Sequence, residues 1–236
     1  MSPDCGLFIT GTDTGVGKTY VARLIARSLR EQGARVGVYK PAASGCRIEQ
    51  GRAMSDDAIA LWETAGQPGG LDRVCPQCFA APLAPHLAAR AEGRTVDRDL
   101  LRRGLDYWRQ RSDVLLVEGV GGLLSPVSDD DYVADLAHEF GLPLVVVSRN
   151  VLGTISQTLQ TLHVAATYRG GLRVAGVVLN DVDPPEQSAD DLSTRTNPEE
   201  LRQRCRAPLL AHVSWNASEL APAVDWQRLW STRSAS

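Results

Sequence analysis

The chain has 236 residues, of which 43% are hydrophobic and 22% charged, and its formal net charge is −3 at pH 7. The composition is typical of a globular protein with a core of its own, and the acidic balance argues against a nucleic-acid-binding surface, which needs a basic stripe. No apolar run approaches the ~18 residues of a membrane span and the N-terminus lacks the basic start of a signal peptide, so we expect a cytoplasmic protein without membrane partners.

Short apolar runs alternate with segments of helical periodicity. The pattern predicts strands at residues 5–10, 35–40, 113–119, 142–148 and 174–181, and helices at 18–33, 56–66 and 97–111. The strand runs are almost continuously apolar, as in strands buried on both faces of a parallel sheet. We therefore expect a three-layer α/β fold with a mostly parallel sheet. We expect one domain over 1–236, with a mobile polar surface loop at about 183–198 and a frayed tail at 231–236.

The stretch GTDTGVGKT at residues 11–19 separates the first predicted strand from the first predicted helix. This context suits a phosphate-binding loop, because backbone N–H groups and a helix N-terminus then face the anion. Gly15 and Gly17 let the backbone close around phosphate oxygens. Lys18 brings positive charge to the β- and γ-phosphates, and Thr19 offers a hydroxyl to Mg²⁺. The loop predicts nucleotide binding but says little about the substrate.

The spacing of this loop departs from two related patterns. The usual GxxxxGK[ST] pattern needs a glycine where this chain has Thr12, and the glycine stands one position earlier, at Gly11. Partition and iron-protein ATPases, which act as switches, have a signature lysine at the position of Asp13. A carboxylate cannot supply that positive charge, so a switch ATPase of this type is the less favoured alternative.

Acidic residues near strand and helix ends are candidate metal ligands. Glu118 ends a predicted strand and is followed by GVGG at 119–122. Ligands bind outside the carboxyl ends of strands in open α/β sheets, and Mg²⁺ favours carboxylates, so Glu118 is a candidate ligand. Asp56 and Asp57 precede a predicted helix, and on this evidence alone a helix-capping role explains them better.

The five cysteines do not suggest a disulfide framework, because their number is odd and we expect a cytoplasmic protein. The motif CPQC at 75–78 is a single CxxC pair. A zinc site usually needs a second pair at a suitable distance, and none follows. We interpret Cys75 and Cys78 as two incidental loop thiols.

Six motifs, in the correct order, resemble the dethiobiotin synthetase family of ATP-dependent cyclo-ligases. They are TGTDTGVGKT at 10–19, YKPAASG at 39–45, DAIAL at 57–61, FAAPLAPHLAA at 79–89, LVEGVGG at 116–122 and NDV at 180–182. The resemblance extends over nearly the whole chain and implies a P-loop nucleoside triphosphate hydrolase-like fold. It implies that CO₂ or bicarbonate forms a carbamate on 7,8-diaminononanoate. ATP then activates this carbamate as a carbamic-phosphoric anhydride, and closure of the ureido ring releases ADP and phosphate.

The resemblance also implies roles for individual residues. The implied catalytic residues are Lys40, Lys18 and Thr14. The implied ATP-binding residues are Asp13, Thr14, Gly15, Val16, Gly17, Lys18, Thr19, Tyr20, Asp57, Glu118, Gly119, Val120, Gly121, Asn180, Asp181, Ser214, Trp215 and Asn216. The implied substrate-binding residues are Thr14, Lys40, Ser44, Pro82, Gly122, Gly153, Thr154 and Ile155. The implied Mg²⁺ ligands are Thr19, Asp57 and Glu118.

These implied roles agree with the chemistry. A carbamate is already an anion, so its phosphorylation needs charge neutralisation and in-line positioning more than a base. Lys40, at a predicted strand end, is suited to that neutralisation. Asn180 falls on the adenine-binding position, where a side-chain amide can pair with the N6/N7 edge.

The resemblance implies a homodimer with the active site near the subunit interface, because the helix start at 153–155 binds the partner's substrate carboxylate. Ser156 and Gln157 replace the Asn-His pair of the family there, and Ser214 replaces a proline. Two further alternatives are less favoured. Cobyrinate synthetases have a glutaminase domain for which this chain has no room, and a noncatalytic nucleotide-binding module would not need Lys40.

Overall fold

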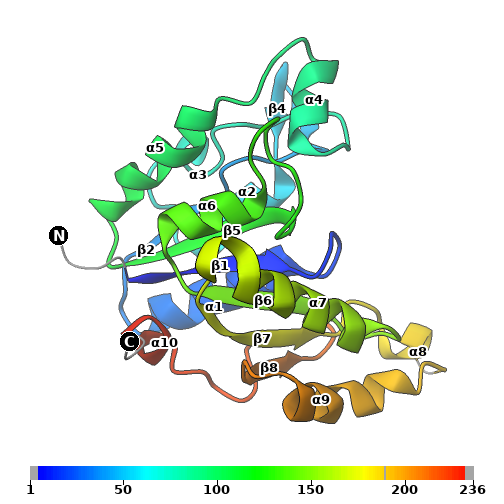
Figure 1. The fold of residues 1–236 in the computed structure, drawn as a ribbon. Helices are drawn as coiled ribbons and strands as arrows, with labels where there is room; N and C mark the ends of the chain where they lie inside the picture. Colours follow the sequence, from blue (N-terminus) through cyan, green and yellow to red (C-terminus); the bar gives the residue numbers. More distant parts are fainter. Residues whose placement is uncertain (1–4, 189, 232–236) are drawn as a thin grey trace.

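Six parallel strands form the central sheet of the computed structural model, which describes residues 5–188 and 190–231 (Figure 1). The spatial order is β2-β5-β1-β6-β7-β8. The strands are β1 (Gly6–Gly11), β2 (Val36–Tyr39), β5 (Val114–Gly122), β6 (Leu144–Arg149), β7 (Val174–Asn180) and β8 (Leu209–Val213). Every pairing in this sheet is parallel, as the apolar runs predict.

Helices cover both faces of the sheet, with α6 and α7 on one face and α1 on the other (Figure 1). The longer helices are α1 (Lys18–Glu31), α2 (Asp56–Thr64), α5 (Arg98–Arg109), α6 (Val133–Phe140), α7 (Thr154–Thr167) and α9 (Ser193–Arg204). Short helices are α3 (Leu71–Val74), α4 (Pro85–Ala91), α8 (Pro185–Ser188) and α10 (Trp226–Ser231), with a 3₁₀ turn at Tyr168–Gly170. The three-layer α/β prediction is confirmed.

The burial pattern explains why the sequence adopts these elements. All six residues of β1 are buried, so the strand lies between two helical layers. In α5, Leu101, Leu105 and Trp108 recur at helical spacing and form its buried face. Asp97 caps this helix by accepting a hydrogen bond from the Leu100 amide at 2.8 Å.

Strand β5 is longer than the sequence predicts. It continues past Glu118 to Gly122, so Glu118 lies within the strand and not at its end. The reason is a break in register. Ile9 of β1 pairs with Glu118, but Gly11 pairs with Gly122, so β5 uses four steps where β1 uses two. The extra residues keep β5 beside the phosphate loop.

The loop predicted at 183–198 is wrong in its secondary structure, because α8 and the first half of α9 occupy most of that range. Its mobility stays a prediction. The polar, proline-bracketed composition of this segment suggested a loop, yet Pro198 lies inside α9. Proline removes the hydrogen bond to the carbonyl four residues earlier, which is that of Thr194. Asn150 Nδ2 donates to the Thr194 carbonyl at 3.0 Å, so the lost bond is replaced.

Several elements lie in segments where the sequence pattern gave no assignment. They include α3, α4, α6, α10 and an antiparallel hairpin of β3 (Arg47–Glu49) and β4 (Arg52–Met54). The predicted frayed tail lies outside the described residues except for Ser231, which ends α10. None of the helices in the described part of the chain combines the length and apolar content needed to cross a membrane.

The parallel arrangement places the carboxyl ends of all six strands at one edge of the sheet. The loops that follow β1, β2, β5, β7 and β8 therefore meet there, as expected for the ligand-binding edge of an open α/β sheet.

Candidate active site

The phosphate loop runs from the end of β1 to the start of α1, and its last glycine has a strict steric role. Gly17 is the N-cap of α1 and has a left-handed φ of 87°. A Cβ at this position would lie 2.1 Å from Asn180 Nδ2, so a side chain would be both strained and blocked. The loop is thus packed directly onto the end of β7.

The early glycine of the loop is also explained by close packing. A Cβ on Gly11 would lie 2.7 Å from Val16 Cγ2 and 2.8 Å from the Asp13 carbonyl oxygen. Val16 is buried, so it cannot move away. In this loop the residue that must be a glycine is therefore Gly11, the last residue of β1. The next position, where the usual pattern has its glycine, can be occupied by Thr12.

Lys18 lies buried inside this loop. Its Nζ donates to the Asp13 carbonyl at 2.8 Å. Burial lowers the pKa of Lys18 to about 8, helped by repulsion from Lys40 and opposed by attraction to Glu118. The Asp13 carboxylate accepts the Thr14 amide at 2.7 Å, so it shapes the loop. The Thr14 side chain is exposed.

Glu118 forms a cluster with the side chains of Thr19, Lys40 and Asp57. Thr19 Oγ1 donates to Glu118 Oε1 at 2.7 Å, and Lys40 Nζ donates to the same oxygen at 2.5 Å. Lys40 Nζ also lies 3.2 Å from Asp57 Oδ2. Burial opposes the charge on Lys40, but attraction to Glu118 and Asp57 outweighs it and raises the pKa of Lys40. The Asp57 side chain is 57% exposed, and although some desolvation opposes its charge, attraction to Lys40 holds its pKa below the usual value.

The same cluster has the donor set that Mg²⁺ requires. A hydroxyl from Thr19 and carboxylates from Asp57 and Glu118 are oxygen ligands, and Mg²⁺ keeps several waters beside them. Glu118 Oε2 is buried and has no hydrogen-bond partner among the described residues, so one oxygen remains available. Across the described chain, no group of three or more His, Cys, Asp or Glu is placed to hold a metal ion. A metal here would need phosphate oxygens or water to complete its shell.

The glycines after Glu118 lie against the phosphate loop. A Cβ on Gly121 would be 3.7 Å from Thr14 Cγ2, and one on Gly122 would be 3.2 Å from the Gly11 carbonyl. The Gly122 amide donates to Ser125 Oγ at 2.9 Å. Sequence reasoning missed Ser125, whose position in a polar loop gives no distinctive signal. Gly119 and Val120 connect Glu118 to this turn.

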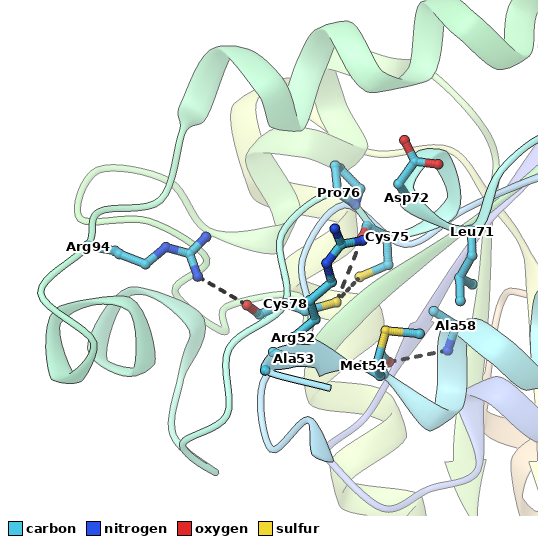
Figure 2. Close-up of a pocket in the computed structure, with 12 residues that line it drawn as sticks. Arg52, Ala53, Met54, Ala58, Leu71, Asp72, Cys75, Pro76, Cys78 and Arg94 are labelled. Atoms are coloured by element: carbon cyan, nitrogen blue, oxygen red, sulfur yellow. Dashed lines mark hydrogen bonds between the residues drawn. The ribbon is translucent and has the colours of Figure 1, made fainter. Parts of the chain in front are cut away.

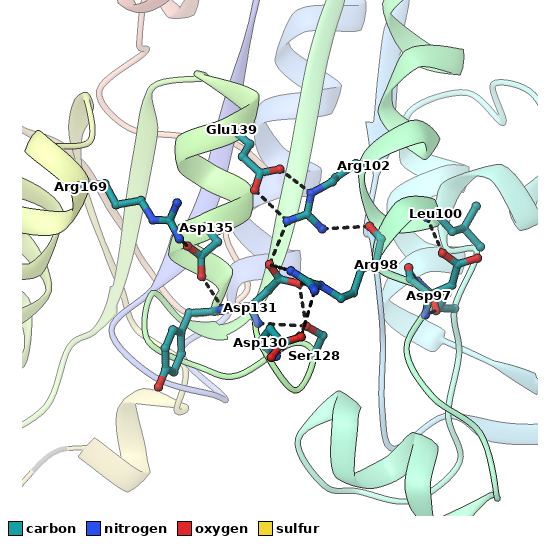
Figure 3. Close-up of polar contacts among 12 residues, drawn as sticks. Asp97, Arg98, Leu100, Arg102, Ser128, Asp130, Asp131, Asp135, Glu139 and Arg169 are labelled. Carbon is teal, nitrogen blue, oxygen red and sulfur yellow. Dashed lines mark hydrogen bonds and ion pairs between the residues drawn. The ribbon is translucent and has the colours of Figure 1, made fainter.

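An ion-pair network with α5 fixes the rest of that loop, which connects β5 to α6 (Figure 3). Asp131 accepts from Arg98 Nε at 2.6 Å, Arg102 at 2.9 Å and Ser128 Oγ at 2.7 Å. Burial alone would raise the pKa of Asp131, but the two arginines and Ser128 hold it well below its ordinary value. The loop is therefore held in place close to the glycines that contact the phosphate loop.

The two segments assigned to substrate binding pair with each other. The Ala43 amide donates to the Gln77 carbonyl at 2.9 Å, and the Gly45 amide to the Ala81 carbonyl at 3.0 Å. A Cβ on Gly45 would lie 3.6 Å from Pro82 Cβ. Ser44 and Pro82 are thus brought together beside Lys40, although they are far apart in sequence.

Asn180 lies under the phosphate loop. Its Nδ2 donates to the Val16 carbonyl at 3.0 Å. Its Oδ1 is buried without a hydrogen-bond partner among the described residues. The amide therefore supports the loop, while its oxygen and second N–H keep their bonding capacity.

A cavity of about 250 Å³ opens next to Asn180, and Asp181, Ser214 and Trp215 help to line it. Asp181 Oδ1 accepts from Asn150 Nδ2 at 2.8 Å and lies 2.9 Å from His212 Nε2. Burial opposes but does not outweigh these contacts, so the pKa of Asp181 is lowered. Sequence reasoning identified Asp181, Ser214 and Trp215 but missed Asn150 and His212.

Tyr20 connects this region to the phosphate loop, because its hydroxyl donates to the Ala217 carbonyl. Asn216 lies in the same turn with a positive φ of 56° and is not among the residues that line the cavity.

The start of α7 is joined to the same edge by hydroxyl groups. Thr154 is fully buried and its Oγ1 lies 2.6 Å from Ser148 Oγ, which is 3.5 Å from Thr12 Oγ1. The Thr154 side chain is therefore occupied within the fold. Gly153 caps the helix with a φ of 98°, and Ile155 is half-buried.

Comparisons with known proteins decide the family. A family model described as an AAA domain matches residues 5–223. The ATP-dependent dethiobiotin synthetase of Rhodopirellula baltica is 44% identical over 219 residues, which cover 87% of this chain and 82% of that protein. The chain belongs to the dethiobiotin synthetase family. The enzyme of that name from Anaeromyxobacter dehalogenans is 42% identical over 210 residues, covering 89% of this chain and 90% of its own length.

A solved structure agrees on the fold. Chloroplast FtsY from Physcomitrella patens superposes with a TM-score of 0.53 at 16% identity. The alignment covers 97% of this chain but 65% of the FtsY chain, so the protein spans about two thirds of the length of that neighbour. This similarity concerns the fold alone and confirms the P-loop nucleoside triphosphate hydrolase-like prediction. The dethiobiotin synthetase relatives do not favour the switch ATPase alternative.

Alanine substitutions at Gly17 and, as a control, at Gly33 test whether the phosphate loop needs a residue without a side chain at position 17. Gly17 and Gly33 both have a φ of 87°, but a Cβ on Gly33 would meet nothing within 4 Å. We expect Gly17→Ala to weaken ATP binding at least about tenfold, since it displaces Asn180 and the loop. Gly33→Ala introduces the same backbone strain elsewhere and should leave the affinity unchanged. Titration calorimetry of both variants measures this, and equal affinities would refute the steric role.

The lowered pKa of Lys18 predicts how ATP binding depends on pH. Phosphate binds the protonated ammonium, so the affinity should fall by up to about tenfold per pH unit as the pH rises through the Lys18 pKa of about 8. The test measures ATP affinity between about pH 7 and about pH 9.5, where phosphate is already ionised. Lys18→Arg stays protonated and should give a flat profile. A flat profile in the unsubstituted protein would contradict this prediction.

Proposed function

We propose that this protein forms dethiobiotin from 7,8-diaminononanoate, CO₂ or bicarbonate, and ATP. The ligase class follows from its family, whose relatives are named ATP-dependent dethiobiotin synthetases. The observation that supports the mechanism is the buried contact of Lys40 with Glu118, together with its contact with the more exposed Asp57, directly beside the phosphate loop.

In this mechanism Lys40 stabilises negative charge on the carbamate and on the transferring phosphoryl group. Its raised pKa keeps it protonated at neutral pH, as the role requires. Lys18 contacts the γ-phosphate from inside the loop, and Thr14 contacts substrate and phosphate from its exposed position. Fixed positive charges that already point at the reacting oxygens lower the barrier without rearrangement.

Mg²⁺ would be held by Thr19, Asp57 and Glu118, and when bound it neutralises charge on the β- and γ-phosphates. Binding would require the Thr19 hydroxyl to turn from Glu118 Oε1 toward the ion. The free Glu118 Oε2 supports this assignment.

The remaining contacts extend the proposal. Ser44 and Pro82 would contact the diamine, and the cavity at Asp181 and Trp215 would hold the base near Asn180. A homodimer would bring residues 153–155 of the partner subunit to the substrate carboxylate. The 82% exposed Leu152 beside them supports a partner at this surface. The cytoplasmic location stays a prediction.

Lys40→Gln tests the role of Lys40. The change keeps the length of the side chain roughly constant but removes the charge, so product formation should fall by about 10²-fold or more. ATP affinity should stay within about threefold of the original, because Lys18 and the loop remain. Dethiobiotin is measured by mass spectrometry and ATP binding by calorimetry. The exposed Arg202→Gln is the control for losing a cation, and normal turnover by Lys40→Gln would overturn the assignment.

A further inference from the structure

Three of the five cysteines gather beside the segment that contains Lys40 and Ser44. Cys75 and Cys78 lie in the turn after α3, with Cys78 Sγ 3.4 Å from Cys75 Sγ. The thiols of Cys46 and Cys78 are also hydrogen-bonded. Cys75 and Cys78 line a cavity of about 580 Å³ (Figure 2). Nothing in the proposed mechanism uses these thiols.

We propose that Cys75 and Cys78 are an oxidation site, at which a small anionic disulfide converts the two thiols into an intramolecular disulfide and slows the enzyme. The Cys78 thiolate attacks one sulfur of the reagent, which forms a mixed disulfide and releases one thiol. The Cys75 thiolate then attacks Cys78 Sγ and releases the second thiol. The protein loses two protons and two electrons, and the reagent is reduced to two thiols.

The geometry favours a disulfide between Cys75 and Cys78 over one that involves Cys46. The sulfurs need to approach from 3.4 Å to the ~2.05 Å of a disulfide, which is a small movement for two residues in one turn. Cys78 is half-buried whereas Cys75 is buried, so Cys78 is the sulfur that a reagent in the cavity meets first.

The reactivity of Cys78 should depend on pH. The hydrogen bond with Cys46 lowers the pKa of Cys78, but the hydrogen bond with Cys75 and burial raise it to about 12. The thiolate is therefore scarce at neutral pH and exchange should accelerate as the pH rises.

The charges around the cavity favour an anionic reagent. Arg52 is exposed, lines the cavity with the two cysteines (Figure 2) and has no ion-pair partner within the described part of the chain. Arg94 also lines it but pairs with Glu92 at 3.1 Å. Asp72 is the acid at this wall, and it lies 3.8 Å from Arg73. Arg52 is thus the charge left to attract a carboxylate.

The turn of these cysteines supports the segment of Lys40. The carbonyl of Val74, next to Cys75, accepts the Lys40 amide at 2.8 Å, and the Gln77 carbonyl accepts the Ala43 amide at 2.9 Å. Oxidation removes the thiol proton that Cys75 donates to Gln77 and shortens the turn. A shift of this segment should slow turnover about tenfold, since small misplacements of a reacting group are costly. This consequence depends on the proposed role of Lys40.

Formation of the Cys75–Cys78 disulfide is tested without measuring enzyme activity. The protein is incubated with oxidised glutathione, free thiols are blocked, and peptides are mapped by mass spectrometry. We expect a Cys75–Cys78 link, faster at higher pH, while Cys75→Ser should retain a stable glutathione adduct on Cys78. Arg52→Gln should slow oxidation by oxidised glutathione but not by cystamine, a cationic disulfide. Absence of the link, or a link through Cys46, would overturn the proposal.

The effect of oxidation on turnover is tested with the same samples. Oxidised protein should turn over about tenfold more slowly and recover with dithiothreitol, whereas Cys78→Ser should keep its basal activity with or without the reagent. Unchanged activity of the fully oxidised protein would refute the effect on turnover. Disulfide formation can also be measured in Lys40→Gln, so failure of the proposed function would not be mistaken for failure of the oxidation site.

Discussion

The arrangement of this site depends on a single buried oxygen, Glu118 Oε1, which accepts hydrogen bonds from both Lys40 and Thr19. Glu118 is 1% exposed, so its charge needs the compensation that Lys40 provides. The contact joins the middle of β5 to the end of β2 and the start of α1. Removing either charge would leave the other buried without its strongest partner, which links the stability of this edge to the positions of its reactive groups.

The positions of the lysines also show that charge is concentrated at this site. The chain contains 25 lysines and arginines, but only two of them, Lys18 and Lys40, are lysines. Both are buried at this site. A lysine ammonium is a compact point charge whose pKa responds to burial, whereas arginine is a larger planar group that stays protonated. The two lysines differ accordingly, with the pKa of Lys18 lowered and that of Lys40 raised. One site thus contains two ammonium groups whose pKa values are shifted in opposite directions.

The sequence predicts the parts of this structure that depend on neighbouring residues. The strand before Gly11 and the helix after Lys18 follow from local periodicity, and motif order identifies the family. The contact of Lys40 with Glu118 joins residues 78 positions apart, so no local pattern could reveal it. The helix around Pro198 was missed for the same reason, since the Asn150 side chain that replaces its lost hydrogen bond lies on a distant loop. The gathering of three thiols likewise becomes visible only in the folded chain.

In the proposed function, the phosphate loop, the Glu118 carboxylate and the two paired segments around Ser44 and Pro82 form a site that couples ATP cleavage to a carbamate. The most direct measurement is ADP release by the purified protein with ATP and Mg²⁺, with bicarbonate and 7,8-diaminononanoate each added or omitted. We expect ADP release only when both are present, accompanied by an equal amount of dethiobiotin. Equal ADP release without the diamine would contradict this coupling and favour a switch ATPase.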